Sequence, residues 1–78
     1  MAAILVIEDD LTFSRILEGF LQKQGFKVSV SHKGLEGLKL FLANPVDLVL
    51  LDYRLPDTSG MEILTEIKKS SPGTPVII

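Results

Sequence analysis

The chain has 78 residues, the length of one small domain, with 10 acidic side chains, 8 basic side chains and one histidine. Because 46% of the residues are hydrophobic and none is cysteine, the composition excludes an intrinsically disordered chain, a disulfide scaffold and a thiolate zinc site. The net charge of −2 argues against direct nucleic-acid binding, and without a signal peptide or an apolar run of roughly 18 residues we expect a cytoplasmic domain with no membrane contact.

The first predicted elements are a strand and a helix. Residues 4–7 are an unbroken apolar run, which is typical of a strand buried on both faces in a parallel sheet. Apolar residues then recur at helical spacing over residues 13–21, which predicts an amphipathic helix. Asp10 or Thr12 is the expected N-cap of this helix, and Gly25 is expected to end it.

The next elements follow the same alternation. Residues 26–31 predict a second strand near the edge of the sheet, because their hydrophobic pattern is weaker and alternates. A second helix is predicted over residues 35–42 and ends at residues 44–45, where a proline follows an asparagine. Residues 46–51 are the most apolar stretch and halt at Asp52, so they are the best candidate for a central strand.

The last predicted elements are a long loop, a helix and a strand. Residues 53–60 are rich in turn-forming side chains. Apolar spacing over residues 61–67 predicts a third helix, and Ser59 and Glu62 have the spacing of a capping box. A stretch rich in serine and proline ends this helix, and residues 76–78 begin a fourth strand.

Alternating strands and helices indicate an α/β fold with an open parallel sheet and right-handed crossovers. Ligands of such sheets bind beyond the carboxyl ends of the strands, where the direction of winding reverses. The first and third strands both end in carboxylates, so we place them side by side. The resulting strand order, 2-1-3-4, is flavodoxin-like and brings Glu8, Asp9 and Asp52 into one crevice.

Three carboxylates in one crevice repel each other. At a separation of ~4 Å and an effective dielectric constant of about 20, each pair costs about 4 kcal/mol. Such a cluster must take up protons or bind a cation. Oxygen ligands without cysteine or neighbouring histidine favour Mg²⁺, Mn²⁺ or Ca²⁺ over zinc or copper.

Two interpretations of these acids stay open on spacing alone. An aspartate at the end of a central strand, beside a cation, is positioned to attack phosphorus and become an aspartyl phosphate. Alternatively, the acids only cap a helix and solvate the ends of strands. The second interpretation suits Asp10 well, but the loop that follows Asp52 is too long for a simple cap.

Two segments of the chain resemble a known family. Residues 4–10 (ILVIEDD) and 47–60 (DLVLLDYRLPDTSG) are similar to the CheY-like receiver domains of response regulators in bacterial two-component systems. The similarity covers the whole chain, and the pairing of these two motifs at this separation is highly specific. The arginine, leucine and proline at 54–56 are similar to those of receivers attached to transcriptional activators.

The resemblance implies specific roles. Asp52 is expected to accept a phosphoryl group from a sensor histidine kinase, as a phospho-acceptor capable of slow self-dephosphorylation rather than an enzyme. Asp9 is expected to bind Mg²⁺ directly, with Mn²⁺ as a substitute, and Glu8 mainly through water. The family more often has aspartate at the position of Glu8. The side chain of Glu8 is longer, and we expect it still to reach a metal-bound water. The backbone carbonyl of Arg54 is expected to complete the protein's share of the ligands.

Other family features are missing from the chain. Receivers carry a threonine or serine at the end of the fourth strand and a lysine at the end of the fifth, and both contact the phosphoryl group. We therefore expect residues 1–78 to be an incomplete receiver domain that lacks the fifth strand and the last two helices.

The missing helix and strand also predict self-association. Without the last helix, apolar side chains of residues 46–51 and 76–78 would be bare on one face of the sheet, and the fourth strand would be an open edge. We expect a homo-oligomer that pairs fourth strands or packs the bare faces together.

Two alternative functions are kept. A phosphatase with an aspartate nucleophile usually carries a second aspartate two residues after the first, where this chain has Arg54. A phosphorylation-silent module for interaction or oligomerisation is the other alternative.

The aromatic residues and the histidine have ordinary interpretations. Phe13, Phe20 and Phe41 lie on the apolar stripes of helices, so we expect them in the core together with Phe26. His32 lies in a turn with no acid nearby in sequence and is expected to be exposed.

Overall fold

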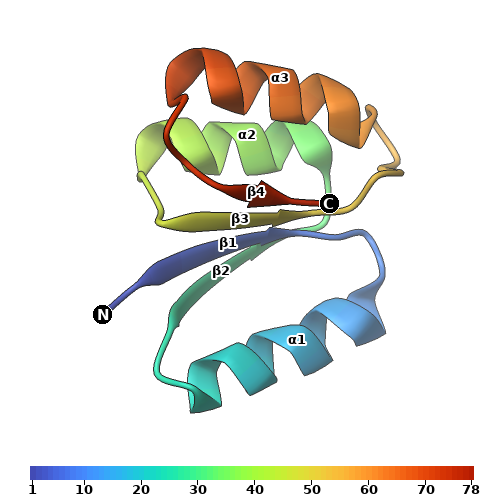
Figure 1. The fold of residues 1–78 in the computed structure, drawn as a ribbon. Helices are drawn as coiled ribbons and strands as arrows, with labels where there is room; N and C mark the ends of the chain where they lie inside the picture. The colour runs from blue at the N-terminus through green and yellow to red at the C-terminus, as the bar shows by residue number, and fades with distance from the viewer.

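Strands and helices alternate along the chain, as the spacing of hydrophobic residues predicts (Figure 1). The computed structural model describes residues 1–78. None of the helices is long and apolar enough to cross a membrane. In chain order the elements are β1 (Ala3–Ile7), α1 (Leu11–Lys23), β2 (Lys27–Ser31), α2 (Gly34–Ala43), β3 (Leu48–Leu51), α3 (Gly60–Ser70) and β4 (Val76–Ile77).

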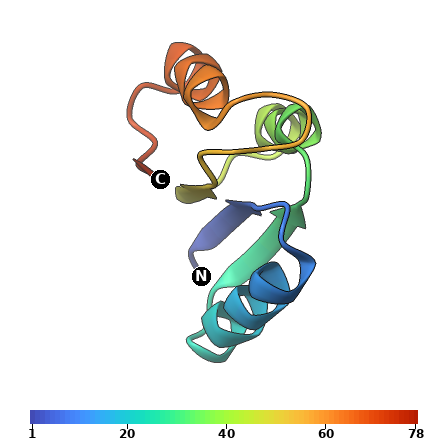
Figure 2. The same cartoon turned by 90° about the vertical axis from the view of Figure 1, so that its right-hand side faces the viewer.

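The sheet is open and entirely parallel, with strand order β2-β1-β3-β4. Ile4 of β1 pairs with Val28 of β2 on one side and with Leu48 of β3 on the other. The flavodoxin-like order predicted from the sequence is therefore confirmed, with β2 at an edge. Helix α1 covers one face of the sheet, and α2 and α3 cover the other (Figures 1 and 2).

The hydrophobic core lies between the sheet and the pair of helices α2 and α3. Gly37 lets α2 approach β1 closely, because a Cβ atom at this position would lie 2.6 Å from Cδ1 of Ile7. Seven buried residues from strands β1 and β3 and from helices α2 and α3 form the core: Leu5, Ile7, Phe41, Val49, Leu51, Ile63 and Ile67.

The prediction that Phe13 and Phe20 belong to the core is wrong. Their side chains are 49% and 58% exposed, whereas Phe41 is buried as predicted and Phe26 is half-buried. Helix α1 lies alone on its face of the sheet, so its apolar stripe is covered along one side only (Figure 2). Helices α2 and α3 also pack against each other, which explains why Phe41 is enclosed.

Strand β3 begins at Leu48, two residues later than predicted. Asp47, just before it, pairs with Ala3 partly through its side chain. Its Oδ2 accepts a hydrogen bond from the Ala3 N–H at 2.7 Å, and its own N–H donates to the Ala3 carbonyl at 2.8 Å. Asp47 thereby closes the amino-terminal end of the pairing between β1 and β3.

Two helices begin at side-chain caps. Asp10, one of the two predicted candidates, caps α1 by accepting a hydrogen bond from the Phe13 N–H at 2.8 Å. Ser59 caps α3 by accepting from the Glu62 N–H at 3.2 Å. The carboxylate of Glu62 accepts from the Thr58 hydroxyl at 2.8 Å, so it bonds to a side chain of the preceding loop and the reciprocal bond of a capping box to Ser59 is not formed.

Candidate functional site

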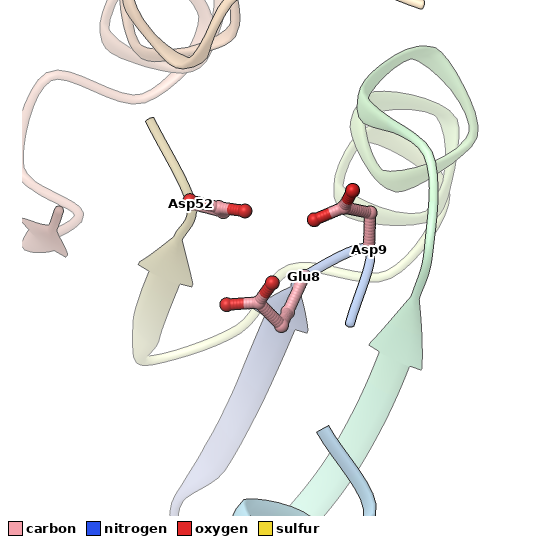
Figure 3. A group of neighbouring side chains, drawn as sticks. All are labelled: Glu8, Asp9 and Asp52. Carbon is pink, nitrogen blue, oxygen red and sulfur yellow. The ribbon is translucent and has the colours of Figure 1, made fainter. Parts of the chain in front are cut away.

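Three acidic side chains meet beyond the carboxyl ends of β1 and β3. Glu8 and Asp9 follow β1 directly, and Asp52 follows β3. One ligand oxygen from each residue lies within 4.8 Å of the other two, and the three carboxylates point toward one another (Figure 3). The structure thus brings together the three acids that the sequence predicts to share one crevice.

The sheet itself fixes the backbone on both sides of this cluster. The Asp52 N–H donates to the Ile7 carbonyl, and the Glu8 N–H donates to the Ser31 carbonyl, each at 2.9 Å. The hydrogen-bond ladder therefore extends one residue past the ends of the paired strands. As a result, Glu8 and Asp52 emerge side by side from the central strands, half-buried, while Asp9 is exposed.

The cluster perturbs the titration of one of its members. The pKa of Glu8 is raised above its usual value, mainly because burial disfavours the charged form. A hydrogen bond from the Asp10 N–H at 3.1 Å lowers the pKa of Glu8, whereas hydrogen bonding with the carboxyl groups of Asp52 and Asp9 and the negative charge of Asp52 raise it further. Glu8 therefore favours a proton or a cation.

No basic side chain neutralises the cluster. The structure contains one ion pair, which joins Lys69 and Glu66 at 3.4 Å on the surface of α3. The three acids have no such partner, so their mutual repulsion is uncompensated. A hard divalent cation fits a cluster of this charge and donor type.

The β3–α3 loop (residues 52–59) is closed at its base by backbone contacts. The Gly60 N–H donates to the Tyr53 carbonyl at 2.8 Å. One step further along the loop, Arg54 and Ser59 form an isolated antiparallel bridge. The loop is therefore a narrow hairpin-like turn, and its first and last residues are held together next to the acidic cluster.

Gly60 is required for this closure. A Cβ atom at this position would lie 2.5 Å from the Asp52 carbonyl oxygen and 2.9 Å from Cα of Tyr53, closer than real Cβ contacts.

The Arg54 N–H faces Oδ1 of Asp52 at 3.4 Å, so the loop backbone lies beside the carboxylate. The role of the Arg54 carbonyl as a metal ligand stays a prediction.

One polar residue of the loop was missed by sequence reasoning. Both carboxylate oxygens of Asp57 accept hydrogen bonds from the start of α2, from the Gly34 N–H at 2.8 Å and the Leu35 N–H at 2.9 Å. These bonds, with that from Leu35 the largest cause, hold the pKa of Asp57 below its usual value. A signal was present in the sequence, because Lys33 precedes α2 where a capping side chain is normally found.

A groove of about 490 Å³ leads away from the acidic cluster along the α1 face of the sheet. Glu8 and Asp52 are among its lining residues. The remainder is mainly apolar and includes Val6, Phe13, Leu17, Leu50, Ile77 and Ile78. Ile77 of β4 is 57% exposed, as expected from the sequence, whereas Leu48 and Leu50 of β3 are half-buried and not bare as predicted.

His32 lies outside the acidic cluster. Its side chain is exposed, as predicted, and Nε2 is 3.3 Å from the hydroxyl of Ser14, which is buried. We assign it no part in the site.

Comparisons with known proteins agree on one family. A sequence model of the response regulator receiver domain matches residues 4–78. An uncharacterized transcriptional regulatory protein of Bacillus subtilis, YkoG, is 40% identical over 75 residues, which cover 96% of this chain and 33% of YkoG. The chain thus spans about one third of the length of that relative.

Solved structures give the same result. The response regulator TrrA from Thermotoga maritima, crystallised with Mg²⁺–BeF, has a TM-score of 0.96 and 35% identity, covering 100% of this chain and 68% of that one. TrrA in its complex with the histidine kinase ThkA has a TM-score of 0.91 and 34% identity, covering 97% of this chain and 66% of that one.

Proposed function

Because this chain belongs to the response regulator receiver domain family, we propose that Asp52 accepts a phosphoryl group from a sensor histidine kinase in a reaction that depends on Mg²⁺. The observation that carries this proposal is the meeting of three carboxylates within 4.8 Å beyond the two central strands. The complexes of TrrA with Mg²⁺–BeF and with a histidine kinase support it by similarity.

The acidic cluster fits magnesium by its donor set. Glu8, Asp9 and Asp52 offer only oxygen ligands, and no lysine or arginine competes for them through an ion pair. We assign the metal to these three side chains and to the backbone carbonyl of Arg54, with Mn²⁺ as a substitute. When bound, the cation offsets the negative charge between the acceptor carboxylate and the incoming phosphoryl group.

The chemistry of the acceptor follows from the position of Asp52. An oxygen of its carboxylate attacks the phosphorus of a phosphohistidine, a P–O bond forms and the P–N bond breaks. The electron pair of that bond stays on the imidazole nitrogen, which takes a proton from solvent. Oδ1 of Asp52 faces the Arg54 N–H at 3.4 Å, so we assign Oδ2 as the attacking oxygen.

The proposal has further parts that rest on the family. Relatives such as YkoG are named as transcriptional regulators, so we propose that residues 1–78 form a receiver part of a transcriptional regulator in the cytoplasm. The chain would then act as a phospho-acceptor, with slow self-dephosphorylation, and not as a phosphatase. Arg54 supports this assignment, since a phosphatase with an aspartate nucleophile usually carries a second aspartate at this position.

The test is phosphorylation by a small acyl phosphate in the presence of Mg²⁺, followed by intact-mass analysis. We expect slow addition of one phosphoryl group to the wild type, because no basic side chain pairs with the cluster. Asp52→Asn should remove the label. Asp47→Asn, at the opposite end of the sheet, serves as the matched control and should keep it. Label that persists in Asp52→Asn would move the acceptor elsewhere.

Self-association is the second candidate function. Phe13, Ile16 and Phe20 of α1 are exposed together with Ile77 and Ile78, and β4 has a partner strand on one side only. Such a surface favours a homo-oligomer that pairs β4 strands or packs these apolar faces together. Light scattering at micromolar concentration tests it, and a stable monomer would rule it out.

A further inference from the structure

Helix α2 begins without a cap of its own. Lys33 occupies the N-cap position in an extended conformation, and its side chain forms no capping hydrogen bond. The first N–H groups of a helix need acceptors from outside the helix. Here Asp57 supplies both acceptors, with Oδ1 bonded to the Gly34 N–H and Oδ2 to the Leu35 N–H.

Asp57 lies near the tip of the β3–α3 loop, 22 and 23 residues away from its two partners along the chain. The loop and α2 are in close contact around these bonds. A Cβ atom at Gly34 would overlap Cγ2 of Thr58 and would lie 3.0 Å from Cδ1 of Leu55. The tip of the loop is therefore fixed to α2, while the backbone bonds described above close its base.

We propose that Asp57 is a positioning residue for the acceptor site: by tying the tip of the β3–α3 loop to α2, it holds the Arg54 backbone beside Asp52. Arg54 lies between the two attachments of the loop, bridged to Ser59 and facing Oδ1 of Asp52. Loss of the carboxylate removes the hydrogen bonds that tie the tip to α2, which loosens the loop and lets the Arg54 backbone move relative to Asp52. The core below the loop does not involve Asp57. This inference rests on the proposed function, because it assigns Asp57 to the same metal site.

The local charges favour this attachment. A carboxylate at the start of a helix is stabilised by the dipole of the helix, and charge-assisted hydrogen bonds to backbone N–H groups are stronger than neutral ones. Lys33 adds a positive charge nearby. Asp57 therefore stays ionised, and both its oxygens remain acceptors at neutral pH.

A pure capping role and a positioning role can be separated by moving the cap. In Asp57→Ala, α2 loses its only side-chain cap and the loop loses its attachment. Adding Lys33→Ser to that variant gives α2 a local cap in the extended N-cap position, without reattaching the loop. If Asp57 only caps α2, the double variant recovers every property of the wild type.

The experiment titrates each protein with Mn²⁺ alone, under conditions where circular dichroism shows all variants to be folded, and measures urea midpoints in parallel. We expect Asp57→Ala to lose about tenfold in Mn²⁺ affinity, the lower end of the range for residues that orient metal ligands. Lys33→Ser with Asp57→Ala should recover the urea midpoint but not the affinity. Asp57→Asn keeps one acceptor oxygen, so its Mn²⁺ affinity should lie between those of the wild type and Asp57→Ala. Asp47→Ala is the matched control, because it also removes an aspartate that accepts a hydrogen bond from a backbone N–H. It should bind Mn²⁺ with the affinity of the wild type.

Each result decides the proposal. Wild-type affinity in Asp57→Ala, or affinity restored by Lys33→Ser, would overturn the positioning role and leave the metal site intact. If Asp57→Ala does not fold, the comparison of Asp57→Asn with the double variant decides in the same way. A wild type that binds no Mn²⁺ would overturn the metal site and the positioning role with it. The first two outcomes are thereby distinguishable from failure of the proposed function.

Discussion

Replacing Asp9 by asparagine should stabilise the metal-free protein and weaken its response to magnesium. A ligand oxygen of Asp9 lies within 4.8 Å of those of Glu8 and Asp52. Because Asp9 is exposed, the repulsion follows the value for water, about 1 kcal/mol for each pair of charges near 4 Å. The two pairs sum to about 2 kcal/mol, and salt screening reduces the gain in the free energy of unfolding to about 1 kcal/mol.

Urea unfolding with and without Mg²⁺ measures both effects. A cation that binds only the folded state raises the free energy of unfolding with its concentration, so the wild type should gain more stability from Mg²⁺ than Asp9→Asn does. Asp10→Asn is the matched control, since it removes a neighbouring charge while asparagine still caps α1. If Asp9→Asn is destabilised without metal and gains as much as the wild type with it, the assignment of Asp9 to a cation site is refuted.

Three further predictions concern the loop, the core and pH. Gly60→Ala should lower the free energy of unfolding by about 1–3 kcal/mol, because the added Cβ overlaps the backbone of the preceding loop; unchanged thermal unfolding would contradict this. Phe41→Ala should cost about 3–5 kcal/mol in urea unfolding and Phe20→Ala much less, because the first side chain is buried and the second is 58% exposed; equal losses would show that α1 is covered. Because the pKa of Asp57 is lower in the folded state than in the unfolded state, its ionised carboxylate stabilises the fold at pH values above the unfolded pKa. This stabilisation should disappear as the pH falls through the pKa of Asp57 in the folded state. An Asp57→Asn variant with the same acid unfolding curve as the wild type would argue against it.

Short-range patterns were sufficient to predict the position of the acidic cluster. Unbroken apolar runs locate β1 and β3, and the acids that halt them must lie at the carboxyl ends of parallel strands. The reversal of winding followed from the same acids, because only neighbouring first and third strands bring Glu8 and Asp52 together. Those inferences need no knowledge of side-chain packing.

The features that were missed depend on tertiary contacts. Helical spacing shows that Phe13 and Phe20 share a stripe, but whether a stripe is enclosed depends on what else lies on that face of the sheet. Asp57 caps a helix 22 residues earlier in the chain, and no local motif links it to Gly34. The later start of β3 reflects the bond between Asp47 and Ala3, which hydrophobicity cannot reveal.

The pairing of β1 with β3 sets an order for assembly. Ala3 and Asp47 are 44 residues apart, whereas β1 and β2 are joined by one short helical crossover. Contacts between distant segments carry a larger loop-closure entropy and form more slowly than local ones. A nascent or partly unfolded chain that has joined only β1, α1 and β2 already carries Glu8 and Asp9, yet does not have Asp52 beside them. The complete acidic cluster therefore exists only in chains that have formed the long-range pairing of β1 with β3, so any function of the cluster is coupled to that pairing.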